Sequence, residues 1–133
     1  MRLDSFQTRL TPQGEQDMAW TIGDHGFDMV LSAYVPEILQ ANLGEILSDL
    51  PDDIQHWAIH PGGRAILDKV EQGLSLPADA LNASRKVLHE NGNMSSATIL
   101  FVLKEMLHGE PGRILGMAFG PGLTVETAIL ESL

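Results

Sequence analysis

Alternating hydrophobic and polar residues dominate the first part of the chain and predict β-strands. Leu3–Leu10 and Met18–Leu31 both alternate roughly in period two, and the residues between them, 11–14, read Thr-Pro-Gln-Gly, which is typical of a turn. These two segments therefore predict a β-hairpin. From Pro36 to Leu50 the apolar residues instead recur three and four positions apart, and Pro36 suits a first helical turn, so a helix follows.

The rest of the chain mixes short strands with helices. The pattern predicts a buried strand at Ile54–Ile59 and three helices, at Gly63–Gln72, Leu76–Glu90 and Ser95–His108. The last of these is apolar nearly all round, which predicts burial on most of its faces. Two strands, Arg113–Phe119 and Leu123–Leu130, flank Gly120-Pro121-Gly122, so the chain closes in a β-hairpin. The fold class is mixed α/β.

Composition narrows the classes of function. The 133 residues carry 18 acidic and 8 basic side chains, a net charge of −10, and the basic residues form no cluster. Nucleic acid and anionic membranes are therefore excluded as expected partners. No basic leader precedes an apolar segment, and no apolar run reaches membrane-spanning length, so we expect a soluble, cytoplasmic protein. The length fits one domain or half of a larger one.

The chain contains no cysteine. This excludes disulfides, thiolate metal sites and a cysteine nucleophile within these residues, and no metal site is expected. Two turns nevertheless carry side chains suited to stabilising an oxyanion. His60 ends a short apolar run and enters the turn Pro61-Gly62-Gly63, whose glycines open the backbone beside the imidazole. Asn93 follows a glycine just before the apolar helix.

Each of these residues also has an ordinary structural interpretation. A lone histidine at a strand end most often bonds a backbone carbonyl. An asparagine after glycine is commonly a helix cap or turn residue. The segment Phe119-Gly120-Pro121-Gly122 is a tight turn, which in addition can form the wall of a pocket.

Three segments together are similar to the C-terminal half of the type III polyketide synthases, the chalcone and stilbene synthase family. They are WAIHPGGRAILDKVE, GNMSSATILFVL and GMAFGPGLTVETAIL, and their order and spacing agree across nearly all 133 residues. The resemblance implies one half of a thiolase-like fold, a mixed five-stranded sheet with helices. Residues 1–133 would then be a single half-domain without the N-terminal half, which carries the family's catalytic cysteine.

The resemblance also implies roles for individual residues. His60 and Asn93 would complete a Cys-His-Asn triad that condenses acyl-CoA starters with malonyl-CoA by decarboxylative Claisen condensation. Coenzyme A thioesters would be substrates, and no cofactor is implied. The implied substrate-binding residues are Ala65 at coenzyme A, Ser95 and Pro121 at the cavity, and Gly62, Gly63, Phe119 and Gly120 on the two glycine-rich turns. This chain alone would be inactive, because no thiol can hold the acyl group.

The plant enzymes of this family have a gate between the tunnel that admits coenzyme A and the active-site cavity. The sequence departs from those enzymes at the residues that align with this gate. Met29 aligns with the plant gatekeeping phenylalanine, Phe27 lies two residues away, and Trp20 falls where plant enzymes carry a small residue. A flexible methionine would loosen this gate. A bacterial-type synthase with fatty acyl or small acyl starters is therefore as well supported as plant-like chalcone formation.

Two alternatives remain open at this point. One is a β-ketoacyl carrier-protein synthase of the initiating type, which also uses Cys, His and Asn, although its histidine segment usually continues differently from HPGG. The other is a non-catalytic binding or interaction domain that retains the half-fold. An adjoining reading frame with a catalytic cysteine would favour the synthase. For the synthase we expect the N-terminal half as a partner, acyl-CoA and malonyl-CoA as substrates, and a second copy in a homodimer.

Overall fold

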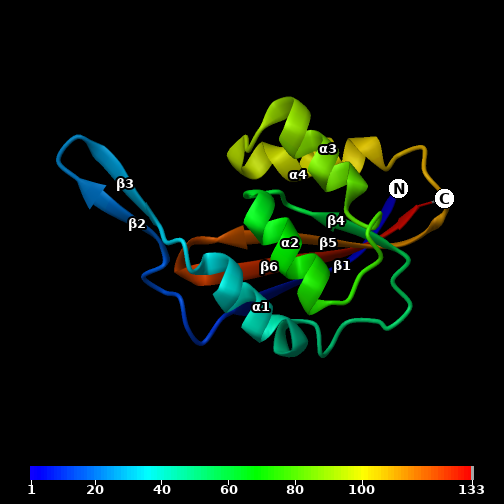
Figure 1. Cartoon of the computed structure of the whole chain (residues 1–133), viewed down its shortest axis with the longest axis horizontal. Coiled ribbons are helices and arrows are strands. Elements are labelled where there is room, and N and C mark those ends of the chain that lie inside the picture. Colours follow the sequence, from blue (N-terminus) through cyan, green and yellow to red (C-terminus); the bar gives the residue numbers. More distant parts are fainter. Residues whose placement is uncertain (133) are drawn as a thin grey trace.

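The computed structural model describes residues 1–132 and has an α/β architecture (Figure 1). The strands are β1 (Arg2–Leu10), β2 (Met18–Gly23), β3 (Gly26–Leu31), β4 (His56–Ile59), β5 (Gly112–Gly120) and β6 (Thr124–Ser132). The helices are α1 (Val35–Ile46), α2 (Arg64–Gly73), α3 (Asn82–Asn91) and α4 (Thr98–Glu105), with 3₁₀ turns at Ser95–Ala97 and Pro121–Leu123. None of the helices within residues 1–132 is both long enough and apolar enough to cross a bilayer.

The main sheet is mixed, with strand order β1-β6-β5-β4. Strands β5 and β6 form the predicted closing hairpin, β1 pairs antiparallel with β6, and β4 runs parallel to β5. This sheet has four strands among the described residues, and β2 and β3 form a separate two-stranded sheet. The mixed sheet fits the expected half-domain, but the expected count of five strands is not confirmed.

The predicted hairpin between Leu3–Leu10 and Met18–Leu31 is wrong. The second segment folds on itself, because the sharp turn between Gly23 and Gly26 brings its two halves into antiparallel register. The first segment instead pairs with β6, and Thr11 continues that pairing by donating its backbone N–H to the carbonyl of Leu123 at 3.2 Å. Period-two alternation identified the extended segments, but it identified neither the turn that divides Met18–Leu31 into β2 and β3 nor the partners of the strands.

The two faces of the main sheet bury different helices. Along the strands, alternate residues point to opposite faces, so Ile59 packs with α1 and α2 while Ala58 packs with α3 and α4. The larger core cluster lies on the α1–α2 side and the smaller one, around Val87 and Val102, lies on the other side. Helices on both faces hold β4 and β5 rigidly, which fixes where their C-terminal ends point.

Helix α4 is less buried than its apolar sequence predicts. Only Thr98 and Val102 are fully buried, whereas Leu100 and Phe101 are 65 % and 40 % exposed. The physical reason is that α4 contacts α3 and β4 along one side, and no other described element covers its outer side. The helix predicted at Leu76–Glu90 starts only at Asn82, because the residues after Pro77 close a turn in which Ala80 donates its N–H to the Pro77 carbonyl.

Candidate functional site

His60 follows the C-terminal end of β4 and is held there by backbone bonds. Its N–H donates to the Met117 carbonyl of β5 at 2.7 Å, and its own carbonyl accepts the N–H of Gly62 at 3.0 Å. The second bond closes the tight turn that leads into α2. The residue is only 8 % exposed, and its ring lines a pocket.

A buried serine ties α3 to the strand that carries His60. The Ser84 hydroxyl is fully buried and donates to the carbonyl of Ile59 at 2.7 Å. Because Ile59 is the residue immediately before His60, this bond fixes the strand end from which the imidazole emerges. Nothing in the local sequence distinguishes Ser84 from an ordinary helix residue.

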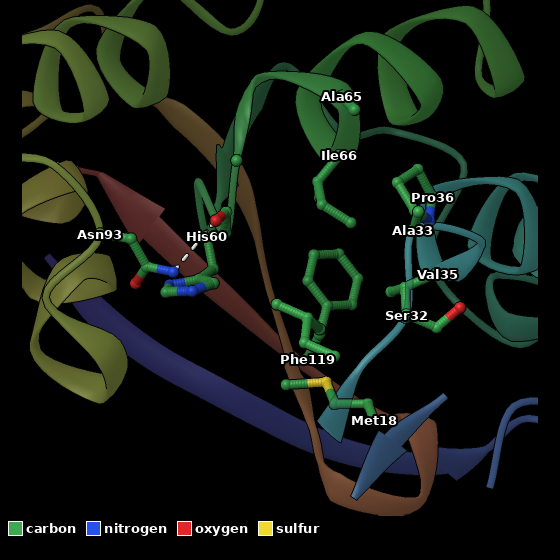
Figure 2. A pocket seen from close by; sticks show the side chains of 13 residues that line it. Met18, Ser32, Ala33, Val35, Pro36, His60, Ala65, Ile66, Asn93 and Phe119 are labelled. Atoms are coloured by element: carbon green, nitrogen blue, oxygen red, sulfur yellow. Dashed lines mark hydrogen bonds between the residues drawn. The ribbon is translucent and has the colours of Figure 1, made fainter. Parts of the chain in front are cut away.

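Asn93 lies in the loop between α3 and α4, and its side chain reaches back to the histidine turn. Its Nδ2 donates to the carbonyl of Gly62 at 3.0 Å, and its Oδ1 accepts the N–H of Ser95 at 2.9 Å. Figure 2 shows the amide next to the His60 ring, with the bond to Gly62 dashed. The two turns singled out in the sequence are therefore joined directly.

These partners fix the orientation of the Asn93 amide. A flipped amide would place Oδ1 against the Gly62 carbonyl and Nδ2 against the Ser95 N–H, and both bonds would be lost. The NH₂ group therefore lies on the side of the histidine turn. Only one of its two N–H groups is used by Gly62 among residues 1–132, so the other is a donor available to a ligand in the pocket.

The pocket is a cleft of about 340 Å³ that is polar at one end and mainly apolar elsewhere (Figure 2). His60 and Asn93 form the polar end. The remaining wall is formed by small and apolar residues and one serine: Met18, Leu31, Ser32, Ala33, Val35, Pro36, Gly62, Gly63, Ala65, Ile66 and Phe119. Among residues 1–132, no Asp, Glu, Lys or Arg side chain lines it. A ligand with one carbonyl and an otherwise apolar body matches this distribution.

Glycine at position 62 keeps one side of the imidazole accessible. A Cβ there would lie 3.8 Å from His60 Cδ2 and 3.9 Å from Nε2, in van der Waals contact with the ring. Glycine leaves that volume free for a ligand. Gly63 is extended, with φ of −178°, and a Cβ there would meet nothing within 4 Å, so the open space at this turn does not depend on glycine at 63.

Burial sets the protonation state of His60. Desolvation lowers the pKa of the imidazole below its ordinary value of 6.5, so the ring is neutral at pH 7. A neutral imidazole has one donor and one acceptor nitrogen. A thiolate placed beside the ring would raise the pKa again, because it stabilises the charged imidazolium.

The structure brings together six of the eleven residues singled out in the sequence. They are His60, Asn93, Gly62, Gly63, Ala65 and Phe119, and all line the pocket. Ser95 does not face the pocket; its backbone N–H donates to Oδ1 of Asn93. Gly120 and Pro121 begin the turn after Phe119. Phe27 and Met29 lie on the projecting β2–β3 hairpin (Figure 1), where they are 70 % and 53 % exposed. Ser95 and these four residues do not line the pocket.

Sequence reasoning missed much of the apolar wall and the buried hydroxyls behind the site. Met18, Val35, Pro36 and Ile66 line the pocket, but each also fits an ordinary strand or helix pattern. They can be recognised as pocket residues only because they come together in the folded structure. Pro36 lies in the first turn of α1, as the sequence predicts, and that role is compatible with its place in the wall.

Comparison with known proteins identifies the family. The model of the C-terminal domain of chalcone and stilbene synthases matches residues 2–133. A type III polyketide synthase of Penicillium soppii is 36 % identical over 133 residues, an alignment that covers 97 % of this chain and 33 % of that protein. The chain thus spans a third of the length of this relative. Neither finding favours the carrier-protein synthase alternative. The chain therefore belongs to the chalcone and stilbene synthase family and corresponds to its C-terminal domain.

Proposed function

We propose that this chain supplies the histidine and asparagine of a type III polyketide synthase active site whose cysteine comes from outside residues 1–133. The single observation that carries the proposal is the pairing of the His60 ring and the Asn93 amide at the polar end of one apolar pocket. The substrates are an acyl-CoA starter and malonyl-CoA, and the reaction needs no further cofactor.

The two side chains would act on the thioester carbonyl of malonyl-CoA. When the bond to the carboxylate breaks, carbon dioxide leaves and the electron pair moves toward that carbonyl, which becomes an enolate oxygen. Donors from the Asn93 amide and the imidazole stabilise this charge, and one such donor is typically worth about 2.7–4 kcal/mol of barrier. The enolate carbon then attacks the acyl thioester on the cysteine, a carbon–carbon bond forms and the thiolate leaves.

His60 would also stabilise the cysteine thiolate before the starter is loaded. Burial lowers the pKa of the ring, so it is neutral at pH 7 on its own, and an anion placed beside it would raise that pKa and favour the protonated form. Proton transfer from the cysteine thiol to the imidazole therefore produces the ion pair in which the thiolate is nucleophilic. The apolar wall would strengthen this pairing because it lowers the local dielectric around the two charges.

The β2–β3 hairpin would extend the apolar wall toward the starter. Its cross-strand pairs Met18–Leu31, Trp20–Met29 and Ile22–Phe27 lie on one face of the ribbon, and the first pair lines the pocket. The hairpin thus carries a continuous apolar face outward from the site. Met29, which aligns with the plant gatekeeper, lies in the middle of that face and would set how wide a starter can pass.

The test is reconstitution with a half that carries the cysteine. We expect this chain alone, incubated with malonyl-CoA and acyl-CoA starters, to give no polyketide by mass spectrometry. Mixed with or fused to a cysteine-bearing N-terminal half, it should form product, and His60→Ala or Asn93→Ala should lower the rate of product formation on the order of 100- to 1000-fold. His89→Ala, on the exposed side of α3, is the matched control and should retain activity. Chain extension by the isolated chain would refute the assignment of the nucleophile.

A further inference from the structure

We infer that Thr98 is a positioning residue that sets the direction of the Asn93 amide, an inference that rests on the proposed function of Asn93. Thr98 is the first residue of α4 and is fully buried. It does not line the pocket. Any effect it has on the reaction must therefore pass through another residue.

The Thr98 hydroxyl bonds two backbone groups of the loop that follows Asn93, the N–H of Met94 and the carbonyl of Ser95. Its Oγ1 accepts the N–H of Met94 at 2.8 Å and donates to the carbonyl of Ser95 at 2.8 Å. Oγ1 also lies 3.5 Å from Asn93 Oδ1. A hydroxyl has a single proton, and the shorter distance assigns it to the Ser95 carbonyl. Thr98 thus fixes the course of the loop immediately after Asn93.

The held loop has an unfavourable backbone conformation. Ser95 has φ of +59°, in the left-handed region that non-glycine residues adopt rarely, so the surrounding bonds must maintain it. That conformation brings the Ser95 N–H to Asn93 Oδ1 at 2.9 Å. This bond in turn leaves Nδ2 for Gly62 and the pocket.

Loss of the hydroxyl would therefore release the amide. Without it, the Met94 N–H and the Ser95 carbonyl lose the bonds that Thr98 supplies, and the strained Ser95 conformation relaxes. The Ser95 N–H then leaves Oδ1, and the amide can rotate until its donor no longer faces the ligand. Displacement of a catalytic group by about 1 Å can cost on the order of 100-fold in rate.

Three variants test the inference in a synthase assembled from this chain and a cysteine-bearing half. Thr98→Val keeps the shape and removes the hydroxyl, so kcat for malonyl-CoA decarboxylation should fall about 10–100-fold with little change in KM. Thr98→Ser should restore most of that rate. In an Asn93→Ala background, Thr98→Val should cause little further loss, because the two side chains act as one unit.

Several results would overturn the inference. They are an unchanged kcat in Thr98→Val, an equal loss in Thr98→Ser, or full additivity with Asn93→Ala. If Asn93→Ala itself leaves decarboxylation unchanged, the proposed function fails, and the positioning is then tested by NMR on this chain alone. There Thr98→Val, but not Thr98→Ser, should move the Asn93 side-chain N–H signals to random-coil shifts and abolish their NOEs to Gly62. Unmoved signals would contradict the positioning role.

Discussion

Removal of the Ser84 hydroxyl is expected to destabilise the domain at the strand that carries His60. In the native structure this hydroxyl is fully buried and donates to the Ile59 carbonyl at 2.7 Å. Ser84→Ala deletes the donor and little else, because alanine fits the same space and suits a helix. The Ile59 carbonyl then stays buried but no longer accepts a hydrogen bond from residue 84.

The size of the effect follows from that burial. Removing one partner of a buried hydrogen bond costs about 1–3 kcal/mol, because the remaining group is left desolvated. At about 2.1 cal/mol/K per residue, a chain of 133 residues has an unfolding entropy of roughly 0.28 kcal/mol/K. The expected fall in Tm is therefore about 4–11 °C.

A second serine provides the matched control. Ser48 also donates its hydroxyl to a backbone carbonyl, that of Glu45 at 2.9 Å, but it is exposed. Water can replace that bond, so Ser48→Ala should change the free energy of unfolding by less than about 0.5 kcal/mol. Urea and thermal unfolding of the two variants give the comparison. Equal, small losses in both would refute the claim that α3 anchors the end of β4 through Ser84.

Two further predictions concern charge and surface. Burial lowers the His60 pKa, so the unfolded state binds the proton more readily; stability should be full above pH 6.5 and fall as the pH drops below it. Urea unfolding at a series of pH values should show that His60→Gln removes part of this loss of stability at low pH. His25→Gln, on the exposed hairpin turn, should not. Identical stability-against-pH profiles for the two variants would contradict the prediction. We also expect the chain to self-associate through the outer side of α4, so Leu100→Glu should lower the sedimentation coefficient at micromolar concentration, and a monomeric wild type would exclude this.

The sequence identified the two polar residues of the pocket better than the residues around them. His60 and Asn93 stand on turns where an ordinary structural role is common, and the resemblance of the surrounding segments to the synthase family distinguished them from such residues. Their joining through Gly62 confirms that the two turns lie together. Ser84 and Thr98 could not be identified, because their partners are set by how α3 and α4 pack and not by local pattern.

The fold shows the same division between local and long-range information. The closing hairpin was predicted correctly because Gly120-Pro121-Gly122 connects strands that are adjacent in the sequence. The pairing of β1 with β6 spans almost the whole chain, and alternation alone does not select such a partner. The apolar outer side of α4 likewise indicated burial, but the pattern does not say which surface provides the cover.

The rate of carbon dioxide release from malonyl-CoA tests the central claim most directly. The measurement compares the wild type with Asn93→Ala in a synthase assembled from this chain and a cysteine-bearing half, alongside product formation. We expect decarboxylation and condensation to fall together, by about 10²–10³-fold, because the same donor stabilises the enolate used by both steps. Carbon dioxide release at the wild-type rate in Asn93→Ala would contradict the account.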